Sequence, residues 1–270
     1  MLGLIKLQKI IDFHAHVFPE KIAEKAVRSL CGFYDFEVPS KNLGTPDDVL
    51  KKAKEGGVDY ILCHSTATSP EQVQAINSWI AGELKDGVLG FGTMHQDYKD
   101  FEKELIRIRT LGLRGIKMHP DFQCFYIDDE KLFGIYRVCE DMDLPILFHA
   151  GDVRYGFSAP KRIYNVMNRF PRLRIIAAHL GGYSEWDSAA EHLSGGNVWY
   201  DTSSTLWFIP PEKATGIIKN HGIKKVFFGT DYPIRNHAEE LEQFNKLGLT
   251  AEEKSLILFE NANEFLGLGL

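Results

Sequence analysis

The chain has 270 residues, of which 44% are hydrophobic and 25% are charged, as is ordinary for a globular protein. Its formal net charge of −6 argues against a general affinity for nucleic acid or for an anionic membrane surface. No apolar run is long enough to cross a bilayer, and the opening segment MLGLIKLQKI lacks the features of a secretory leader. We expect one domain over residues 1–270, because this length suits a single α/β barrel.

The cysteine pattern favours a reducing compartment. None of the cysteines forms a Cys-x-x-Cys pair, so we interpret all of them as reduced thiols of a cytoplasmic protein. Cys63 and Cys139 have apolar neighbours and are expected in the core, while Cys31 and Cys124 carry no such signal.

Apolar runs recur along the chain with helix-like segments between them. Each run is nearly continuous in Val, Ile, Leu and Phe, as expected for parallel strands buried on both faces. The pattern predicts strands at Lys9–His14, Val58–Cys63, Val88–Thr93, Arg114–Met118, Pro145–His149, Arg174–Ala178, Val198–Asp201 and Lys225–Gly229. This alternation indicates a (β/α)₈ barrel, or TIM barrel. An open doubly wound sheet is the alternative, but no Gly-rich phosphate turn follows the first strand.

Start and stop signals mark the helices between these strands. Thr45-Pro46-Asp47-Asp48 combines an N-cap, a proline at the first helical position and acidic residues in the first turn, and Gly56-Gly57 ends that helix. Comparable signals predict helices over Glu20–Leu30, Pro46–Glu55, Gln72–Leu84, Lys131–Met142 and, at the C-terminus, Asn261–Phe265.

The longest connection, from Val17 to Gly57, is predicted to be a helical insertion after the first strand. It contains two of the predicted helices and, between them, the aromatic loop Cys31–Phe36. In a barrel this insertion would leave the catalytic face. It could therefore form a lid over the site, or it could only pack against the rim.

The first strand ends in the motif His14-Ala15-His16. Residues two apart on a strand point to the same side, so both imidazoles aim at one place. Paired neutral imidazoles are good ligands for a divalent metal. An isolated His-x-His also occurs as two ordinary hydrogen-bonded histidines.

Later strands end in the same residue types, and the carboxyl ends of parallel barrel strands meet on one face, where active sites are built. The residues at these ends are His64, His95, Lys117, His119, His149, His179, Asp201 and Asp231. This recurrence favours a shared site over scattered structural histidines.

Each candidate also has a structural alternative. His149 could be a core histidine bonded to a carbonyl, and Asp231 could cap a turn, although an acid after so apolar a strand is costly unless paired or bound to metal. His179 is expected in the site as ligand or as acid–base. Asp12 either holds an imidazole by its second nitrogen or is a buried structural acid. Asp201 is either a site residue or a cap.

Three histidines give weaker signals. Of His64, His95 and His119, we expect only one to contact substrate or metal.

The ordered set resembles the amidohydrolase superfamily: His-x-His after strand one, His after strands five and six, and Asp after strand eight. The segments Gly115–Pro120, Ala178–Gly182 and Gly229–Pro233 are typical of its amidohydrolase-2 branch, which includes small-molecule hydrolases, lactonases and decarboxylases similar to aminocarboxymuconate semialdehyde decarboxylase. The resemblance runs from about Ile10 to the C-terminal helix. TatD-like deoxyribonucleases also begin with His-x-His, but they carry a glutamate where this chain has Lys117.

The resemblance implies that His14, His16, His149 and Asp231 are the metal ligands and that His179 acts beside the metal. Elsewhere in the superfamily the lysine matching Lys117 is carbamylated and bridges two metals. In this branch the site is generally mononuclear, so we favour one metal with Lys117, His119 and Arg154 binding substrate. The same implication makes a homodimer possible.

Three imidazoles and one carboxylate suit Zn²⁺, with Mn²⁺ as an alternative. A metal-bound water, its pKa lowered from about 16 toward roughly 7, would attack a carbonyl. Asp231 would carry the proton and His179 would stabilise the oxyanion. The sequence therefore predicts a metal-dependent hydrolase of an amide, lactone or ester-like compound.

Two alternatives remain open. The same centre could decarboxylate an unsaturated or aromatic acid, which requires cations such as Lys117, Arg154 or Arg162 for the carboxylate. Phe157 and Trp207 would then form an apolar wall or only pack at the rim. The other alternative is an inactive barrel that serves as a binding protein.

Overall fold

The computed structural model describes residues 8–37 and 42–270. Residues 1–7, which include most of the segment inspected for a leader, and residues 38–41 of the predicted insertion lie outside the described residues. Within the described ranges, no helix is long and apolar enough to span a membrane.

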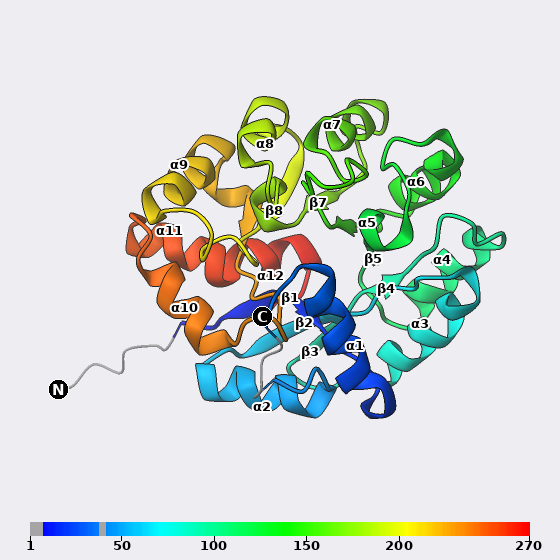
Figure 1. The fold of residues 1–270 in the computed structure, drawn as a ribbon, viewed down its shortest axis with the longest axis horizontal. Helices are drawn as coiled ribbons and strands as arrows, with labels where there is room; N and C mark the ends of the chain where they lie inside the picture. Colours follow the sequence, from blue (N-terminus) through cyan, green and yellow to red (C-terminus); the bar gives the residue numbers. More distant parts are fainter. Residues whose placement is uncertain (1–7, 38–41) are drawn as a thin grey trace.

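The strands form the predicted parallel barrel, ringed by helices (Figure 1). Their order along the sheet follows their order in the sequence. The strands are β1 (Ile11–His16), β2 (Tyr60–His64), β3 (Val88–Gly90), β4 (Gly92–Thr93), β5 (Ile116–Met118), β6 (Ile146–Phe148), β7 (Ile175–Ala177), β8 (Val198–Asp201) and β9 (Val226–Phe227).

The predicted strand Val88–Thr93 is divided into β3 and β4 at Phe91. The backbone N–H of Phe91 donates to the β2 side, whereas that of Gly92 donates to the β5 side, so neighbouring residues pair with opposite neighbours. The barrel closes between its last and first strands, where Phe13 N–H donates to the Phe228 carbonyl at 2.8 Å. The barrel prediction is therefore confirmed, with one strand interrupted.

The helices lie where the start and stop signals place them, with ends shifted by a few residues. Thr45 caps α2 by accepting a hydrogen bond from Asp48 N–H at 3.3 Å, and Gly57 ends it with φ of 78°. The α-helices are α1 (Glu20–Phe33), α2 (Pro46–Gly56), α3 (Val73–Gly82), α4 (Phe101–Thr110), α5 (Pro120–Gln123), α6 (Phe133–Asp141), α7 (Pro160–Arg169), α8 (Trp186–Leu193), α9 (Pro211–His221), α10 (His237–Asn245), α11 (Ala251–Ser255) and α12 (Asn261–Leu266).

Short helical turns complete the connections. A π-helical turn, η5, joins α11 to α12 and keeps them close to the barrel. The turns are η1 (Pro70–Gln72), η2 (Glu130–Leu132), η3 (His179–Gly181), η4 (Ile223–Lys225) and η5 (Leu256–Glu260).

Two apolar layers surround the strands. The larger layer lies between strands and helices and contains Cys63 and Cys139, which are buried as predicted. The smaller layer fills the barrel interior and includes α12, whose Phe265 ring contacts Phe227 at a centroid distance of 5.1 Å. The C-terminal helix thus closes the end of the barrel opposite the predicted site.

Candidate active site

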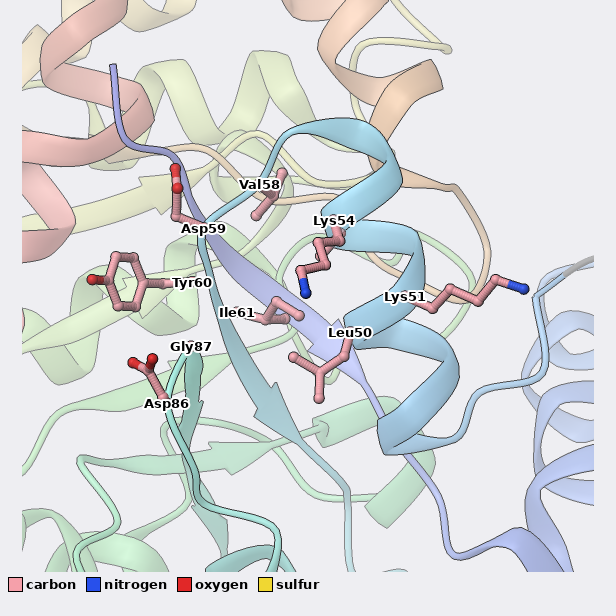
Figure 2. Close-up of a pocket in the computed structure, with 10 residues that line it drawn as sticks. Leu50, Lys51, Lys54, Val58, Asp59, Tyr60, Ile61, Asp86 and Gly87 are labelled. Atoms are coloured by element: carbon pink, nitrogen blue, oxygen red, sulfur yellow. The ribbon is translucent and has the colours of Figure 1, made fainter. Parts of the chain in front are cut away.

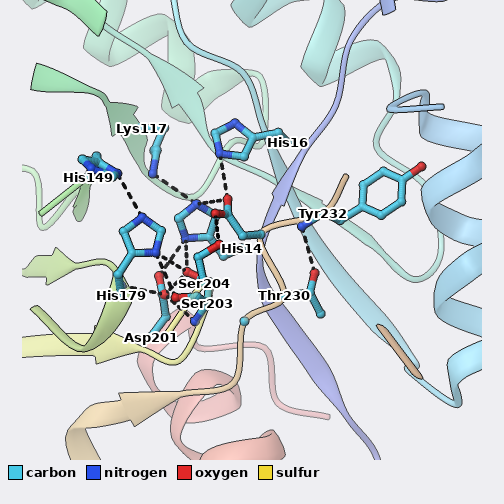
Figure 3. A network of polar contacts seen from close by, with 12 residues as sticks. His14, His16, Lys117, His149, His179, Asp201, Ser203, Ser204, Thr230 and Tyr232 are labelled. Carbon is cyan, nitrogen blue, oxygen red and sulfur yellow. Dashed lines mark hydrogen bonds and ion pairs between the residues drawn. The ribbon is translucent and has the colours of Figure 1, made fainter. Parts of the chain in front are cut away.

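A β-bulge in β1 aims two histidines into the barrel mouth. The pairing of β1 with β2 shifts between Asp12 and Ala15, so that two residues of β1 lie opposite one residue of β2. His14 and His16 are both buried beyond this bulge, with ring centroids 5.3 Å apart (Figure 3). The prediction that their rings share one side is confirmed.

The contacts of Asp12 decide between its two predicted roles. Its carboxylate accepts hydrogen bonds from Thr230 N–H at 3.0 Å and from Thr230 Oγ1–H at 2.6 Å. It also lies 3.1 Å from Nε2 of buried His237. Asp12 therefore does not hold the ring of His14; it is a buried structural acid that joins β1 to the segment after β9.

Asp231 lies between the two histidines of the first strand. Its Oδ1 is 3.2 Å from His16 Nε2 and 3.4 Å from His14 Nε2, and Ser204 Oγ–H donates to its Oδ2 at 2.6 Å. The residue adopts φ of 61°, and its backbone N–H donates to the His14 carbonyl at 2.9 Å. This left-handed conformation fixes the carboxylate over β1.

Asp201 holds the other nitrogen of His14. Its Oδ2 is 2.8 Å from His14 Nδ1, and both side chains are fully buried. Its Oδ1 accepts the hydroxyl of Ser203 and the backbone N–H of His179. Of the two roles predicted for Asp201, it therefore has the one in the site, because it fixes the orientation of the His14 ring.

His149 and His179 form a second pair. His179 Nε2 lies 2.9 Å from His149 Nδ1, and His179 Nδ1 lies 2.9 Å from the Ser203 carbonyl. Among the described residues, no hydrogen bond or ion pair links His149 directly to His14, His16 or Asp231. Of the four predicted ligands, His14 and His16 thus both contact the third, Asp231. The fourth, His149, is linked to them through His179 and Ser203.

The insertion reaches into this site. Tyr34, which follows α1, lies with its hydroxyl 2.8 Å from His119 Nε2 and 3.3 Å from His149 Nε2. The His119 and His149 rings stack at 4.2 Å with an interplanar angle of 8°. The aromatic loop after β1 therefore covers the histidines directly instead of only packing at the rim.

Lys117 is buried beneath the histidines. Its Nζ lies 3.3 Å from His14 Nε2, and the side chain is 1% exposed. Burial lowers its pKa from 10.5 to about 8, so it remains a cation at neutral pH. A buried positive charge at this point can hold an acidic substrate.

Two of the three weaker histidine candidates lie against the cluster. His64 is fully buried, with its ring 4.7 Å from that of His14 and 4.5 Å from that of His16. His119 joins through its stack on His149. His95 is turned away, since its Nδ1 accepts the Asp97 N–H at 3.2 Å.

The candidate arginines are occupied elsewhere. Arg154 pairs with Asp152 at 2.7 Å, and its Nη1 donates to the Phe33 carbonyl at 2.5 Å. Arg162 pairs with Asp128 at 2.6 Å. Both arginines were predicted to bind the substrate carboxylate, but these contacts already occupy their guanidinium groups. Arg154 instead holds the end of α1 over the site, and Arg162 stabilises a peripheral loop.

The predicted aromatic wall lies at the rim. Trp207 is 37% exposed and donates its indole N–H to Glu240 at 2.6 Å. Phe157 packs against Tyr155 with a centroid distance of 6.2 Å. Rim packing, the second of the two roles considered, describes both residues.

The sequence did not single out the hydroxyl residues after β8. Ser203 contacts His14 Nδ1 at 3.1 Å and His179 Nδ1 at 3.0 Å, and Ser204 holds Asp231. The run Asp201-Thr202-Ser203-Ser204 at a strand end was the available signal. These hydroxyls connect the two histidine groups.

Burial lowers the pKa of three imidazoles of the site and so keeps them neutral. It lowers the pKa of His16 and of His179 to about 4, and it holds the pKa of His149 well below 6.5. Burial alone would raise the pKa of Asp231, but the hydrogen bond from His16 and the nearby His14 hold it well below its usual range. Neutral imidazoles beside an ionised carboxylate form a donor set that fits a divalent first-row metal.

A large cavity opens from this cluster between α1 and α3. Its volume is about 1080 Å³, His16 and Asp121 lie along its wall, and the remaining lining is mostly apolar. Both carboxylate oxygens of Asp121 are buried without a hydrogen-bond partner in the described part of the chain. The large apolar residues that line the cavity are Phe18, Ile22, Leu30, Phe33, Ile76, Trp79 and Phe122.

A second cavity, of about 640 Å³, lies beside α2 at the opposite ends of the strands (Figure 2). Lys51, Lys54, Asp59 and Asp86 line it, together with apolar residues. It contains none of the imidazoles and is remote from the chemistry of the barrel mouth.

Comparison with known proteins identifies the family. The family model Amidohydro_2, described as amidohydrolase, matches residues 11–268. The chain belongs to this amidohydrolase family. The resemblance drawn from the histidine and aspartate positions is therefore confirmed, and the chain is an enzyme of the amidohydrolase superfamily.

The amidohydrolase shares sequence with two decarboxylases. The 2-amino-3-carboxymuconate-6-semialdehyde decarboxylase of Dictyostelium discoideum is 22% identical over 96% of this chain and 91% of its own length. Decarboxylase orsB of Emericella nidulans is 28% identical, but that match covers 37% of this chain and 36% of orsB.

Solved structures share the fold of this amidohydrolase. A 2,6-dihydroxybenzoate decarboxylase complexed with 2,6-dihydroxybenzoate superposes with a TM-score of 0.76 and 17% identity, covering 96% of this chain and 99% of the other. A dihydroxybenzoic acid decarboxylase from Polaromonas sp. JS666, with bound manganese, gives 0.76 and 15%, covering 97% and 98%. An uncharacterised TIM-barrel protein from Bordetella bronchiseptica gives 0.75 and 20%, covering 96% and 98%.

These relatives overturn the prediction of a hydrolase. The full-length relative is a decarboxylase, and so are the dihydroxybenzoate and carboxyvanillate enzymes that superpose on the chain, which matches the alternative considered from the sequence. The reason for the error is chemical: the same imidazoles and carboxylate suit both reactions. Zinc is not specifically supported either, since manganese is the bound metal named for two superposed decarboxylases.

Proposed function

We propose that this amidohydrolase is a metal-dependent decarboxylase of an aromatic or unsaturated carboxylic acid. The observation that carries the proposal is the match to 2-amino-3-carboxymuconate-6-semialdehyde decarboxylase, which extends over 96% of the chain. The buried cluster of imidazoles, carboxylate and lysine beside an apolar cavity supports it independently.

The shape of the site suits a flat apolar acid. The cavity beside His16 has aromatic side chains in its wall, including Phe33 and Phe122, and these rings can contact the face of an aromatic or polyene substrate. The buried cation Lys117 can pair with the substrate carboxylate. Lys117 would thus bind the carboxylate of the substrate, and the aromatic wall of the cavity would contact its apolar part.

The residues proposed to hold the metal are His14, His16, His149 and Asp231. Asp201 would orient His14 by keeping its Nδ1 occupied at 2.8 Å, which leaves Nε2 on the Asp231 side. When bound, a divalent cation would supply a Lewis acid that binds substrate oxygens and stabilises negative charge.

The reaction breaks the bond between the substrate carbon and its carboxyl group, and carbon dioxide leaves. The electron pair remains on that carbon, which then takes up a proton. Asp231 is ionised in the resting site, so it would take up one proton from solvent water as the substrate enters and then deliver it to the carbon, and one proton is consumed for each carbon dioxide released. Ser204, which donates to Asp231 Oδ2 at 2.6 Å, keeps the carboxylate in position for this transfer.

Tyr34 and His119 help to close the site against solvent. The tyrosine hydroxyl bonds to His119 at 2.8 Å and covers His149, so the insertion limits the access of bulk water to the histidines. Exclusion of water strengthens the electrostatic interactions inside the site and suppresses side reactions.

The test is a substrate panel offered to protein loaded with Mn²⁺ or Zn²⁺. The panel contains 2,6-dihydroxybenzoate, 5-carboxyvanillate and 2-amino-3-carboxymuconate-6-semialdehyde, together with lactone and amide compounds. Carbon dioxide is measured by mass spectrometry from carboxyl-labelled substrate, and the decarboxylated product by chromatography. We expect carbon dioxide release from at least one acid and none from metal-stripped protein. Consumption of a lactone or amide with no acid decarboxylated would overturn the proposal.

A further inference from the structure

Among the described residues, His64 is the one member of the histidine cluster with no hydrogen-bond partner for either ring nitrogen. It ends β2, its side chain is fully buried, and neither Nδ1 nor Nε2 has a hydrogen-bond partner within the described residues. A buried polar atom without a partner costs about 1–3 kcal/mol. In contrast, His14, His16, His149 and His179 each have a nitrogen against another polar atom.

The fold places His64 beside the predicted ligands. His64 lies directly opposite His16 in the pairing of β1 with β2. Its ring stands nearly edge-on to both neighbours, at an interplanar angle of 73° to His14 and 82° to His16. The position is therefore set by strand register instead of by a mobile loop.

The distances suit a shared cation. His14, His16 and His64 each offer one ring nitrogen, and these nitrogens lie within 4.8 Å of one another. Two nitrogens bound to one ion at about 2.1 Å are at most about 4.2 Å apart. Shifts of less than about 1 Å in the side chains would therefore satisfy this limit, a small change for histidine rings.

We propose that His64 is an additional ligand of the divalent metal bound by His14 and His16, so that β2 contributes an imidazole to the centre. The inference rests on the metal in the proposed function, and it adds a residue beyond the predicted set. It accounts for one of the two ring nitrogens of His64 that are buried without a hydrogen-bond partner in the described part of the chain. The alternative is a histidine that only fills space.

His64→Leu separates these two roles. Leucine fills a similar volume and removes both unpartnered nitrogens, so a space-filling histidine could be replaced with no loss, or with a gain in stability. A ligand could not. The matched control is His95→Leu, because His95 also follows a strand of the same face and is buried, but its ring is turned toward Asp97.

The measurement is Co²⁺ binding to metal-stripped protein, followed by the visible absorption of the ion and by competition with a chelator. Mn²⁺ paramagnetic resonance provides a second readout of bound nitrogens. We expect His64→Leu to weaken Co²⁺ binding at least tenfold and to change the absorption bands, whereas His95→Leu stays within twofold of wild type. His64→Asn gives the second variant if leucine prevents folding, which circular dichroism reveals.

The outcomes distinguish this inference from the proposed function. Wild-type affinity and absorption in a folded His64 variant would overturn the role of His64 alone. No Co²⁺ binding by the wild-type protein would overturn it together with the metal part of the proposed function. Normal metal binding with the expected His64 effect, but no decarboxylation, would support this inference and count against the decarboxylase.

Discussion

The two ends of the barrel use the same strands for opposite purposes. At the amino ends, Phe13 stacks on Phe227 at 4.2 Å and α12 adds Phe265, which gives a closed apolar layer. At the carboxyl ends the interior changes abruptly to imidazoles and carboxylates, beginning with His14, the residue after Phe13. The apolar layer that stabilises the fold and the polar groups of the site are thus adjacent along β1.

This contrast explains how so many polar groups can be buried together. The apolar end supplies burial of hydrophobic surface, the dominant favourable contribution to folding. The polar end must satisfy its own groups: Asp201 holds His14, Ser204 holds Asp231, and Ser203 joins His14 to His179. Changes at one end should therefore leave the function of the other end intact.

Asp231→Asn should have the largest effect at the polar end. The asparagine side chain has nearly the same shape but cannot carry the proton, so we expect the turnover number to fall roughly a thousandfold. The folded structure should remain, because Ser204 can still donate to the amide oxygen. Turnover is measured with the acid identified in the substrate panel, and thermal unfolding is the control. A loss smaller than about tenfold would mean that another residue carries the proton.

Phe265→Ala should have the largest effect at the apolar end. Removing a ring packed against Phe227 and Trp199 should lower the free energy of unfolding by about 3 kcal/mol, as measured by urea denaturation. The metal affinity and the turnover number of the remaining folded protein should be unchanged within twofold. A parallel loss of metal affinity would show that the two ends are coupled.

The sequence predicted the barrel and the main members of the site for a physical reason. Parallel strands buried on both faces are nearly continuous apolar runs, so the polar residue that ends each run is conspicuous. His14 and His16 were assigned to one side by the period of a strand, and Asp231 by the cost of an acid after an apolar run. These signals are local in the chain.

The roles left open from the sequence, and the one wrong prediction, depended on features that are not local. Asp12 and Asp201 each had two predicted roles, and contacts distant in sequence select between them, because Asp201 contacts the His14 ring and Asp12 contacts Thr230. Tyr34 reaches His119 across 85 positions of sequence, so the loop that contains it was recognisable but its contact was not. The reaction type was wrong because ligands alone do not distinguish hydrolysis from decarboxylation.

Asp201→Asn should have an intermediate effect. Asparagine can still contact His14 Nδ1, but it removes the charge that orients the ring, so metal affinity should fall by about 10–100-fold. The readout is competition for Mn²⁺ with a chelator. Glu104→Gln is the matched control, since Glu104 is a comparably buried acid whose carboxylate contacts Arg107 and Asn77 instead of the site. Equal losses in both variants would mean that the His14–Asp201 contact does not matter for the metal.

His221 offers the smallest and most separable effect, because it lies outside the site. Its Nε2 is 2.9 Å from the Val198 carbonyl and its ring stacks on Tyr200 at 3.7 Å. Burial lowers the pKa of His221 to about 4, below the value of about 6.5 for an unfolded chain. The unfolded chain therefore binds a proton first as the pH falls, and the stability from His221 is complete above pH 6.5 and lost progressively toward pH 4.

The expected difference appears when wild type is compared with His221→Gln. Glutamine can still donate to Val198 but does not titrate. Between pH 7 and pH 5.5, the free energy of unfolding of the wild type should therefore fall by about 1 kcal/mol more than that of the variant. Urea denaturation at both pH values gives this difference. The other buried histidines titrate equally in both proteins and cancel, so identical pH dependence would mean that His221 is not kept neutral by burial.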